Sequence, residues 1–320
     1  MSRNARLALT AAGLIFGVTP GAHVTAKQPP NPAITSQTPC VFGPYDDQPA
    51  FTRRVYSRDE YDAARTSTAV ECRRITYLSD GLKVVGFIVQ PASTGRRHPV
   101  IVFNRGGLLE IGKITEMNLV DFYDLASQGF LVVASQYRGN DGGEGREEFG
   151  GSDVNDVLAL RDLAMTLPNA DPQNVFFYGL SRGGMMTFLA LRRGATVNAV
   201  AVVGALLDLE GTTEAAKLRA PGIAKAVFNL IPDYATRGAS ALRDRSAIHW
   251  PEAVNVPALI IHGGADQEVP VSGSLTFAAK LNDLHKSFEL LVYAGDAHEV
   301  TNNRKDRNSR IVSWFRRHVK

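Results

Sequence analysis

The sequence predicts an α/β fold in which a mostly parallel central sheet is covered by helices on both faces. From about residue 99 onward, short apolar runs of strand length alternate with stretches of helix length. Continuous apolar strands are typical of a parallel sheet that is buried on both sides by the connecting helices. An apolar content of 44% over 320 residues is enough for a sizeable core.

The elements are expected in the following order. A capping box at Ser57 predicts a short helix to about residue 64, and residues 75–78 and 82–89 predict a hairpin around the turn at 79–81. Further strands are expected at 99–103, 130–135, 174–178, 197–203, 256–261 and 288–292. Helices are expected at 117–127, 152–167, 184–191, 272–284 and 308–317.

Three segments stand apart from this alternation. Residues 1–26 have a basic start, an apolar run of about a dozen residues and a Pro-Gly break, which predicts a secretory signal peptide. Residues 27–70 form an N-terminal lead-in, which is expected to be loosely ordered up to about residue 50; residues 71–320 form the α/β domain. Within it, residues 208–253 contain no clear strand and could form a helical cap or a surface excursion with a small core of its own.

The signal peptide predicts export, to the periplasm or the medium. The two cysteines, Cys40 and Cys72, both fall early in the chain, and two is a pairing number in an exported protein. We therefore expect a disulfide between them; the alternative is two unrelated buried thiols. No later stretch is long and apolar enough to span a bilayer, and Cys40 lacks the small-residue context of a lipidation site, so no stable membrane anchor is expected.

The charge of the chain does not indicate a polyanionic partner. The formal net charge is +3, and two of these charges lie in the signal peptide. The arginine pairs along the chain are scattered and do not form one basic block, so no nucleic acid is expected as a partner. The glycine-rich run 139–145 carries two acidic residues and opens on no helix, which excludes a phosphate-binding loop. The sequence gives no indication of an oligomeric state.

The pentapeptide Gly179-Leu180-Ser181-Arg182-Gly183 is the strongest chemical signal. It lies between a β-branched and aromatic run and a helix-forming stretch, which is the strand-to-helix context of a nucleophile elbow. The turn is so tight that only glycine fits two residues on either side of the serine. Together with the hairpin and the parallel sheet, this motif predicts the α/β-hydrolase fold with Ser181 as the nucleophile.

In this fold the acid and the histidine follow the serine on loops after later strands. Asp266 follows the strand that ends at the glycine turn 263–264, and His298 follows the last strand. Histidine can accept the serine proton near neutral pH, and a carboxylate fixes its tautomer. Glu268 and Asp296 are alternatives for the acid. His262 precedes the glycine turn, where a structural hydrogen bond is the commoner role.

Two backbone N–H groups are needed to stabilise the negative charge that develops on a substrate carbonyl. The N–H of Arg182, directly after the serine, is the natural first donor. The second is expected in the loop after the strand at 99–103, from Gly106 or Gly107, since glycines let a carbonyl approach the backbone closely. The sequence carries no cluster of histidines and carboxylates at ligand spacing, so no metal and no cofactor are expected.

With these residues placed, the chain resembles the catalytic domain of the prolyl oligopeptidase family of serine hydrolases. The resemblance covers about residues 75–320. It rests on the triad order, on Tyr137-Arg138-Gly139 with the glycine-rich residues up to Val157, and on the approach to the acid at 245–263. It implies Ser181, Asp266 and His298 as the catalytic triad.

There are two departures from this family. The chain has no room for the large β-propeller that often precedes the catalytic domain, and Arg105 stands where relatives carry a tyrosine or histidine near the paired glycines. Both leave peptide specificity open. Arg105 could bind a substrate carboxylate or form a salt bridge with an acid such as Glu110.

The sequence thus predicts an exported serine hydrolase that cleaves an ester or a short peptide through an acyl-enzyme. Its substrate would be a small ester or a short peptide. The contrasting hypothesis is a non-catalytic binding protein that keeps the fold, but such a protein would not need serine, acid and histidine together.

Overall fold

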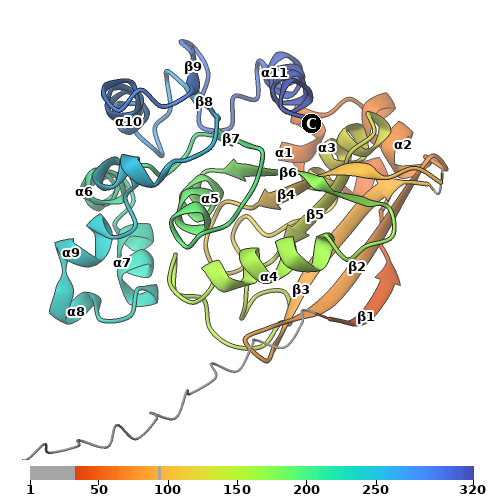
Figure 1. Cartoon of the computed structure of the whole chain (residues 1–320), viewed down its shortest axis with the longest axis horizontal. Helices are drawn as coiled ribbons and strands as arrows, with labels where there is room; N and C mark the ends of the chain where they lie inside the picture. Colours follow the sequence, from red (N-terminus) through yellow and green to blue (C-terminus); the bar gives the residue numbers. More distant parts are fainter. Residues whose placement is uncertain (1–32, 93–94) are drawn as a thin grey trace, which may run out of the picture. The chain divides into compact units, whose positions relative to one another are not determined.

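The computed structural model describes residues 33–92 and 95–320 (Figure 1). The predicted signal peptide at 1–26 and the first residues of the lead-in lie outside this range. Among the described residues, no helix is both long and apolar enough to cross a membrane.

A single sheet organises the described residues. Its nine strands lie in the order β1-β2-β3-β5-β4-β6-β7-β8-β9, and the six strands from β5 to β9 in this order run parallel, while β1, β2, β3 and β5 pair antiparallel. The strands are β1 (Ile34–Pro39), β2 (Val70–Ser79), β3 (Leu82–Pro91), β4 (His98–Asn104), β5 (Leu131–Ser135), β6 (Ala170–Leu180), β7 (Ala199–Val203), β8 (Ala258–Gly263) and β9 (Phe288–Tyr293). The predicted α/β-hydrolase arrangement, with a hairpin before a mostly parallel sheet, is confirmed.

Helices cover both faces of the sheet. One face packs against α4 (Val154–Ala164), α5 (Arg182–Arg192) and α10 (Ser272–Asp283), and the other against α3 (Glu116–Ser127) and α11 (Arg304–Arg317). The inward side chains of the strands are fully buried on each face, for example Val102 against the first layer and Ile101 against the second. This double coverage explains why the central strands are apolar at every position and not at every second one.

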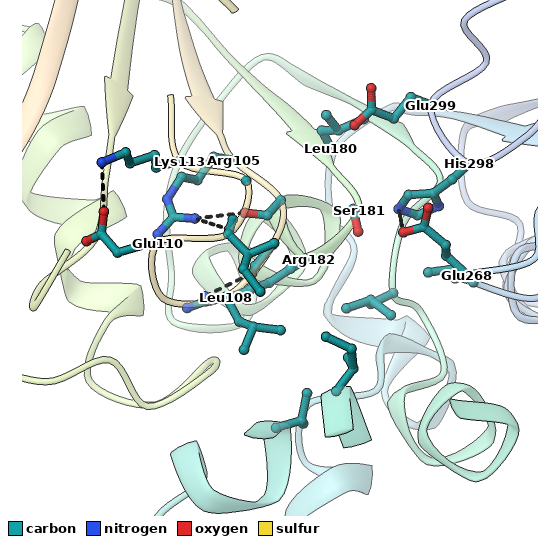
Figure 2. Close-up of a pocket in the computed structure, with 18 of the residues that line it drawn as sticks. Arg105, Leu108, Glu110, Lys113, Leu180, Ser181, Arg182, Glu268, His298 and Glu299 are labelled. Atoms are coloured by element: carbon teal, nitrogen blue, oxygen red, sulfur yellow. Dashed lines mark hydrogen bonds and ion pairs between the residues drawn. The ribbon is translucent and has the colours of Figure 1, made fainter. Parts of the chain in front are cut away.

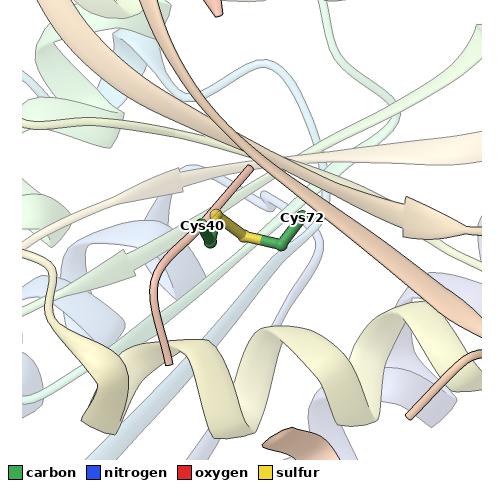
Figure 3. Close-up of a disulfide and its surroundings, with 2 residues drawn as sticks. All are labelled: Cys40 and Cys72. Atoms are coloured by element: carbon green, nitrogen blue, oxygen red, sulfur yellow. A yellow bond between two sulfur atoms is a disulfide. The ribbon is translucent and has the colours of Figure 1, made fainter. Parts of the chain in front are cut away.

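The lead-in is more ordered than its composition predicts. The expectation of a loose segment up to residue 50 was wrong for the residues that the structure describes there, since β1 pairs with β2 at the sheet edge. Two helices follow, α1 (Ala50–Val55) and α2 (Arg58–Arg65), and Ser57 and Glu60 form the expected capping box on α2. A disulfide joins Cys40 to Cys72 of β2, with the two Cα atoms 5.4 Å apart (Figure 3). The strand pairing, the helices and the disulfide order this segment, and a proline-rich composition does not predict them.

Residues 208–253 are helical and lie together beside α5, at the left of Figure 1. They form α6 (Leu209–Arg219), α7 (Pro221–Leu230), α8 (Tyr234–Arg237) and α9 (Ala239–Arg243), followed by two short 3-10 turns at Ala247–His249 and Pro251–Ala253. Their buried apolar side chains join the same core cluster as the strands, so this segment is not an excursion with a separate core.

Candidate active site

Ser181 sits at the sharp turn between β6 and α5. Its backbone has φ 55° and ψ −121°, a region that L-residues rarely occupy. The two flanking glycines are required by close backbone approach: a Cβ at Gly179 would lie 2.5 Å from the carbonyl oxygen of Gly183, and a Cβ at Gly183 would lie 1.7 Å from that of Asn104. The turn thus holds the serine hydroxyl above the carboxyl ends of the strands, as expected for a nucleophile elbow.

Asp266 and His298 meet on the neighbouring loops, after β8 and β9. The Nδ1 atom of His298 lies 2.7 Å from Oδ2 of Asp266. The other carboxylate oxygen accepts backbone N–H groups from Glu268 and Val269, at 2.8 and 2.9 Å. These bonds fix the carboxylate, which in turn fixes the imidazole with Nδ1 as donor and leaves Nε2 as the basic atom.

His298 and Ser181 line one cavity of about 580 Å³, and Figure 2 shows the imidazole beside the serine. Burial raises the pKa of Asp266, but the hydrogen bonds from His262 and His298 outweigh it and hold that pKa well below its ordinary value. Burial lowers the pKa of His298, yet the hydrogen bond and charge of Asp266 raise it above its ordinary value of 6.5. The carboxylate therefore stays ionised, and the histidine can exchange a proton near neutral pH.

The other acids and histidine considered from the sequence have different surroundings. Asp296 is buried and accepts hydrogen bonds from Asn302 and Asn303, so it organises the turn before α11. Glu268 is largely exposed, with Oε2 4.0 Å from Nε2 of His298. His262 is fully buried; its Nδ1 contacts Ser274, and its Nε2 lies 3.1 Å from Asp266. The structure therefore places Asp266, and neither Glu268 nor Asp296, against Nδ1 of His298.

The proposed oxyanion donors lie on the other side of Ser181. The N–H of Arg182 is the first of α5, where the backbone donors of a helix have no partner within the helix. A Cβ on Gly106 would lie 3.1 Å from the Cβ of Ser181, so this backbone approaches the nucleophile closely. In the part of the chain that the structure describes, no backbone carbonyl accepts a hydrogen bond from the N–H of Gly106 or Gly107.

Of the two roles expected for Arg105, the structure shows the salt bridge, although with a different acid from the one named. Its side chain is 1% exposed, and its nitrogens donate to the carbonyl oxygens of Gly106, Leu109 and Gln136 at 2.9–3.0 Å. Its acidic partner is Glu147, at 3.7 Å, and not Glu110, which pairs with Lys113. Burial lowers the pKa of Arg105 to about 10, so the guanidinium stays charged at neutral pH.

Arg182 contributes a buried side chain as well as a backbone donor. Its guanidinium pairs with Glu147 at 2.6 Å and with Asp153, and it donates to the carbonyl oxygen of Gly107 at 3.2 Å. Arg105, Glu147, Arg182 and Asp153, each at most 1% exposed, thus form a buried ion network beneath the loop 106–111. Burial lowers the pKa of Arg182, but the charges of Glu147 and Asp153 outweigh this and raise it.

The cavity has a helical wall. Side chains from α6 and α7 face the same space as Ser181, and most of them are apolar or small; they are Leu209, Thr212, Thr213, Ala216, Ile223, Ala224 and Val227. The lining also includes Pro49, Phe51 and Thr52 from the lead-in. The first two helices of the 208–253 segment, α6 and α7, therefore line the site, and the lead-in forms part of it, which its sequence did not indicate.

Glu147 and Asp153 were not identified as site residues from the sequence. Asp153 lies in the glycine-rich signature after β5, and Glu147 lies two residues before Phe149 in the same stretch. In the sequence, this stretch indicates only a family resemblance. An acid next to a glycine-rich segment carries no local sign that it will meet two arginines from distant parts of the chain.

Comparisons with known proteins show the family to which the chain belongs. The model of the prolyl oligopeptidase family matches residues 117–320, a range that contains Ser181, Asp266 and His298. The uncharacterized peptidase YtmA of Bacillus subtilis is 31% identical over 233 residues, covering 72% of this chain and 88% of that protein. Acylamino-acid-releasing enzyme 2 of Oryza sativa is 26% identical over 263 residues, but this chain spans only 33% of its length.

Solved structures show the same fold. The acylaminoacyl peptidase of Pyrococcus horikoshii superposes with a TM-score of 0.66 at 23% identity, over 80% of this chain and 43% of that one. The chain thus spans less than half of this structural neighbour, although it spans most of the Bacillus relative. On the family match and the relative that is 31% identical, the chain belongs to the prolyl oligopeptidase family and is a serine hydrolase of the peptidase type.

Proposed function

We propose that Ser181, Asp266 and His298 form a catalytic triad that hydrolyses a peptide or ester bond through an acyl-enzyme. The observation that carries this proposal is the 2.7 Å bond between Asp266 and His298, with the imidazole beside the elbow serine in one cavity. A binding protein that merely kept the fold would have no need of this arrangement, which argues against the non-catalytic hypothesis.

The proposed reaction proceeds in two halves. The hydroxyl oxygen of Ser181 attacks the substrate carbonyl carbon while its proton passes to Nε2 of His298. The tetrahedral intermediate then collapses, and the same proton goes to the leaving amine or alcohol as its bond to the carbonyl carbon breaks. Water repeats the sequence on the acyl-enzyme and regenerates the serine. Asp266 stabilises the imidazolium in both halves.

The negative oxygen of each intermediate would accept hydrogen bonds from the N–H of Arg182 and of Gly107 or Gly106. Both donors belong to rigid backbone next to Ser181, so they would need no reorganisation during the reaction. The positive end of α5, whose first residue is Arg182, adds favourable electrostatics at the same position.

The cavity favours a substrate with an apolar group beside the scissile bond. Apolar side chains from α6 and α7 line one wall, and the cavity is open to the surface. One relative bears the name acylamino-acid-releasing enzyme, and an acylaminoacyl peptidase among the structural neighbours was solved with a peptide chloromethyl ketone. These names support short peptides as substrates of this chain, with esters as the second class.

The direct test is Ser181→Ala. We expect turnover of ester and peptide substrates to fall by about 10⁴-fold or more while the fold is retained, and labelling by a fluorophosphonate probe to disappear. Near-normal turnover in the folded variant would contradict the triad. Equal inertness of the wild-type protein toward matched apolar ester, peptide and acyl-peptide substrates would contradict the hydrolytic proposal itself.

We also propose that the protein acts outside the cytoplasm. The basic and apolar start of the sequence and the Cys40–Cys72 disulfide support this, since structural disulfides persist in oxidising compartments. Fusion of residues 1–40 to an export reporter tests the leader. Retention of that reporter in the cytoplasm would contradict the proposal.

A further inference from the structure

We propose that Arg105 is a positioning residue for the oxyanion hole: its buried guanidinium, held by Glu147, sets the orientation of the Gly106–Gly107 peptide and so aims the Gly107 N–H at the reacting carbonyl. The inference rests on the proposed function. It assigns a role to the residue by which the sequence was expected to depart from the family pattern.

The geometry of one peptide unit sets the direction of the Gly107 N–H. A trans peptide is planar, so its C=O and N–H point in opposite directions, and the described residues contain no cis peptide. Nη1 of Arg105 donates to the Gly106 carbonyl oxygen at 3.0 Å. The N–H of Gly107 belongs to the same peptide unit and therefore points away from the guanidinium.

The Gly106–Gly107 peptide lies beside the nucleophile. The backbone of Gly106 lies against Ser181, since a Cβ there would approach both the Cβ of the serine and the carbonyl oxygen of Leu180. Figure 2 shows the Arg105 guanidinium well separated from Ser181. The guanidinium of Arg105 donates to the carbonyl oxygens of Gly106, Leu109 and Gln136, so its influence on the substrate passes through the loop backbone.

The same network holds the rest of the loop. Arg105 donates to the Leu109 carbonyl at 2.9 Å and to the Ile111 carbonyl at 3.3 Å, and Arg182 donates to the Gly107 carbonyl. Glu147 accepts the N–H of Leu109 at 3.1 Å. Gly107 has φ 70°, and a Cβ there would lie 2.1 Å from the Ile111 carbonyl oxygen, so the loop is closed tightly on itself.

The arginine side chain suits this position because of the shape of its guanidinium. A guanidinium presents several donors in one rigid plane, so it can bridge separate carbonyl oxygens at once, which an ammonium on a flexible stem does poorly. Glu147 joins both arginines and also accepts from Nδ2 of Asn140 at 2.7 Å. The aromatic ring of Tyr137 lies within 5.2 Å of both guanidinium carbons. These contacts hold the guanidinium of Arg105 on several sides at once.

The test is Arg105→Lys, which keeps the charge and loses the fork. A small shift of an oxyanion donor costs about 10²-fold, so we expect kcat to fall about 10- to 100-fold with KM changed less than about threefold. The matched control is Arg138→Lys. Arg138 is also buried, but its fork binds Asp156 and Asp80 and touches no carbonyl of the loop, so this variant should keep kcat within about twofold.

A second readout separates positioning from general damage. A trifluoromethyl ketone with an apolar side chain adds to Ser181 and places a negative oxygen in the oxyanion hole, whereas the corresponding alcohol only fills the cavity. In Arg105→Lys the affinity for the ketone should fall in parallel with kcat/KM, and the affinity for the alcohol should stay. Equal losses for both compounds, or a folded variant with kcat within twofold of the wild type, would overturn the inference.

Should Arg105→Lys fail to fold, Glu147→Gln serves in its place, because the amide keeps an acceptor for the Leu109 N–H and removes the charge that holds Arg105. We expect about a tenfold loss of kcat with the same selective loss of ketone affinity; no such selectivity would overturn the inference. Wild-type hydrolysis that is abolished in Ser181→Ala decides the proposed function separately, so failure here leaves that function standing.

Discussion

The two sides of Ser181 are built on different principles. On one side, Asp266 and His298 lie on loops after β8 and β9 and meet through a single hydrogen bond beside the open cavity. On the other side, the loop 106–111 is held by three almost completely buried charged side chains, Arg105, Glu147 and Arg182, and Asp153 pairs with Arg182 behind them. The first side includes His298, which exchanges a proton near neutral pH; the second includes Arg105, whose guanidinium stays charged in the same range because its pKa is about 10.

This difference follows from the tasks we propose for each side. A group that moves a proton must change its charge during each turnover and must have its pKa near the working pH. A backbone donor that stabilises developing charge must not move at all. Removing one partner from a buried ion pair costs about 3–5 kcal/mol, so the network under the loop also resists local opening.

The largest effect is expected on the proton-transfer side. Asp266→Asn keeps the size of the side chain but can no longer stabilise the imidazolium, so kcat should fall about 10³- to 10⁴-fold. The matched control is Asp296→Asn, at the other buried acid of the same region, which should lower stability and keep kcat within about threefold. Stopped assays on an apolar ester would measure both. A kcat within tenfold of the wild type for Asp266→Asn would contradict the role of Asp266 on the proton-transfer side of Ser181.

The next effect concerns the rigid side. Gly107→Ala places a Cβ against the Ile111 carbonyl oxygen at a positive φ, so the loop must shift. We expect kcat to fall about 10²- to 10³-fold, as for loss of one oxyanion donor. Gly129→Ala is the control, because Gly129 also has a positive φ but an added Cβ meets nothing within 4 Å. That variant should lose about 1 kcal/mol of stability and no activity. Equal kcat values for the two variants would show that the loop is not the sensitive element.

The third effect concerns substrate selectivity, which we assign to the cavity wall formed by α6 and α7 and to neither side of Ser181. Ala216→Phe fills part of the cavity from α6, so kcat/KM for a substrate with a bulky apolar group should fall about 10- to 100-fold, while a small substrate is affected only a few-fold. Leu218→Phe, on the same helix but 90% exposed, should change neither. Parallel losses for both substrates in Ala216→Phe would indicate that the wall positions the triad and does not select substrates.

The smallest effect concerns the pH dependence of activity, which is set by the titration of His298. The activity should rise with pH through the pKa of His298, which lies above 6.5, because only the neutral imidazole can accept the serine proton. Glu268 carries a negative charge 4.0 Å from Nε2 and favours the imidazolium. Glu268→Gln should therefore move the acidic limb of kcat/KM to lower pH by about half a unit, less at high salt. Glu147→Gln, on the other side, should leave the limb in place. A shift to higher pH in Glu268→Gln would refute this electrostatic assignment.

The sequence was informative where chemistry and local geometry coincide. The elbow around Ser181 has a spacing that only a strand-to-helix turn requires, and the sheet and its helices followed from the apolar runs. The acid was less determined, because Asp266, Glu268 and Asp296 all lie near strand ends, and only folded geometry shows which of them faces His298.

The rest could not be predicted because it depends on contacts between distant segments. Arg105 and Glu147 are 42 positions apart in the printed sequence, and nothing near either residue specifies the other. A charged residue after a strand is usually exposed, so burial of Arg105 was not expected. Order in the lead-in likewise comes from pairing with β2 and from the disulfide, neither of which a proline-rich composition reveals.

The disulfide has a consequence for how substrates enter. Pro49, Phe51 and Thr52, which line the cavity, belong to a segment that crosses from the sheet edge to α2, and Cys40 fastens the start of this segment to β2. The lead-in side of the cavity is thus tied covalently to β2 through the Cys40–Cys72 disulfide. Thiol reductants should therefore loosen the lead-in segment that lines the cavity before they disturb Ser181, Asp266 and His298.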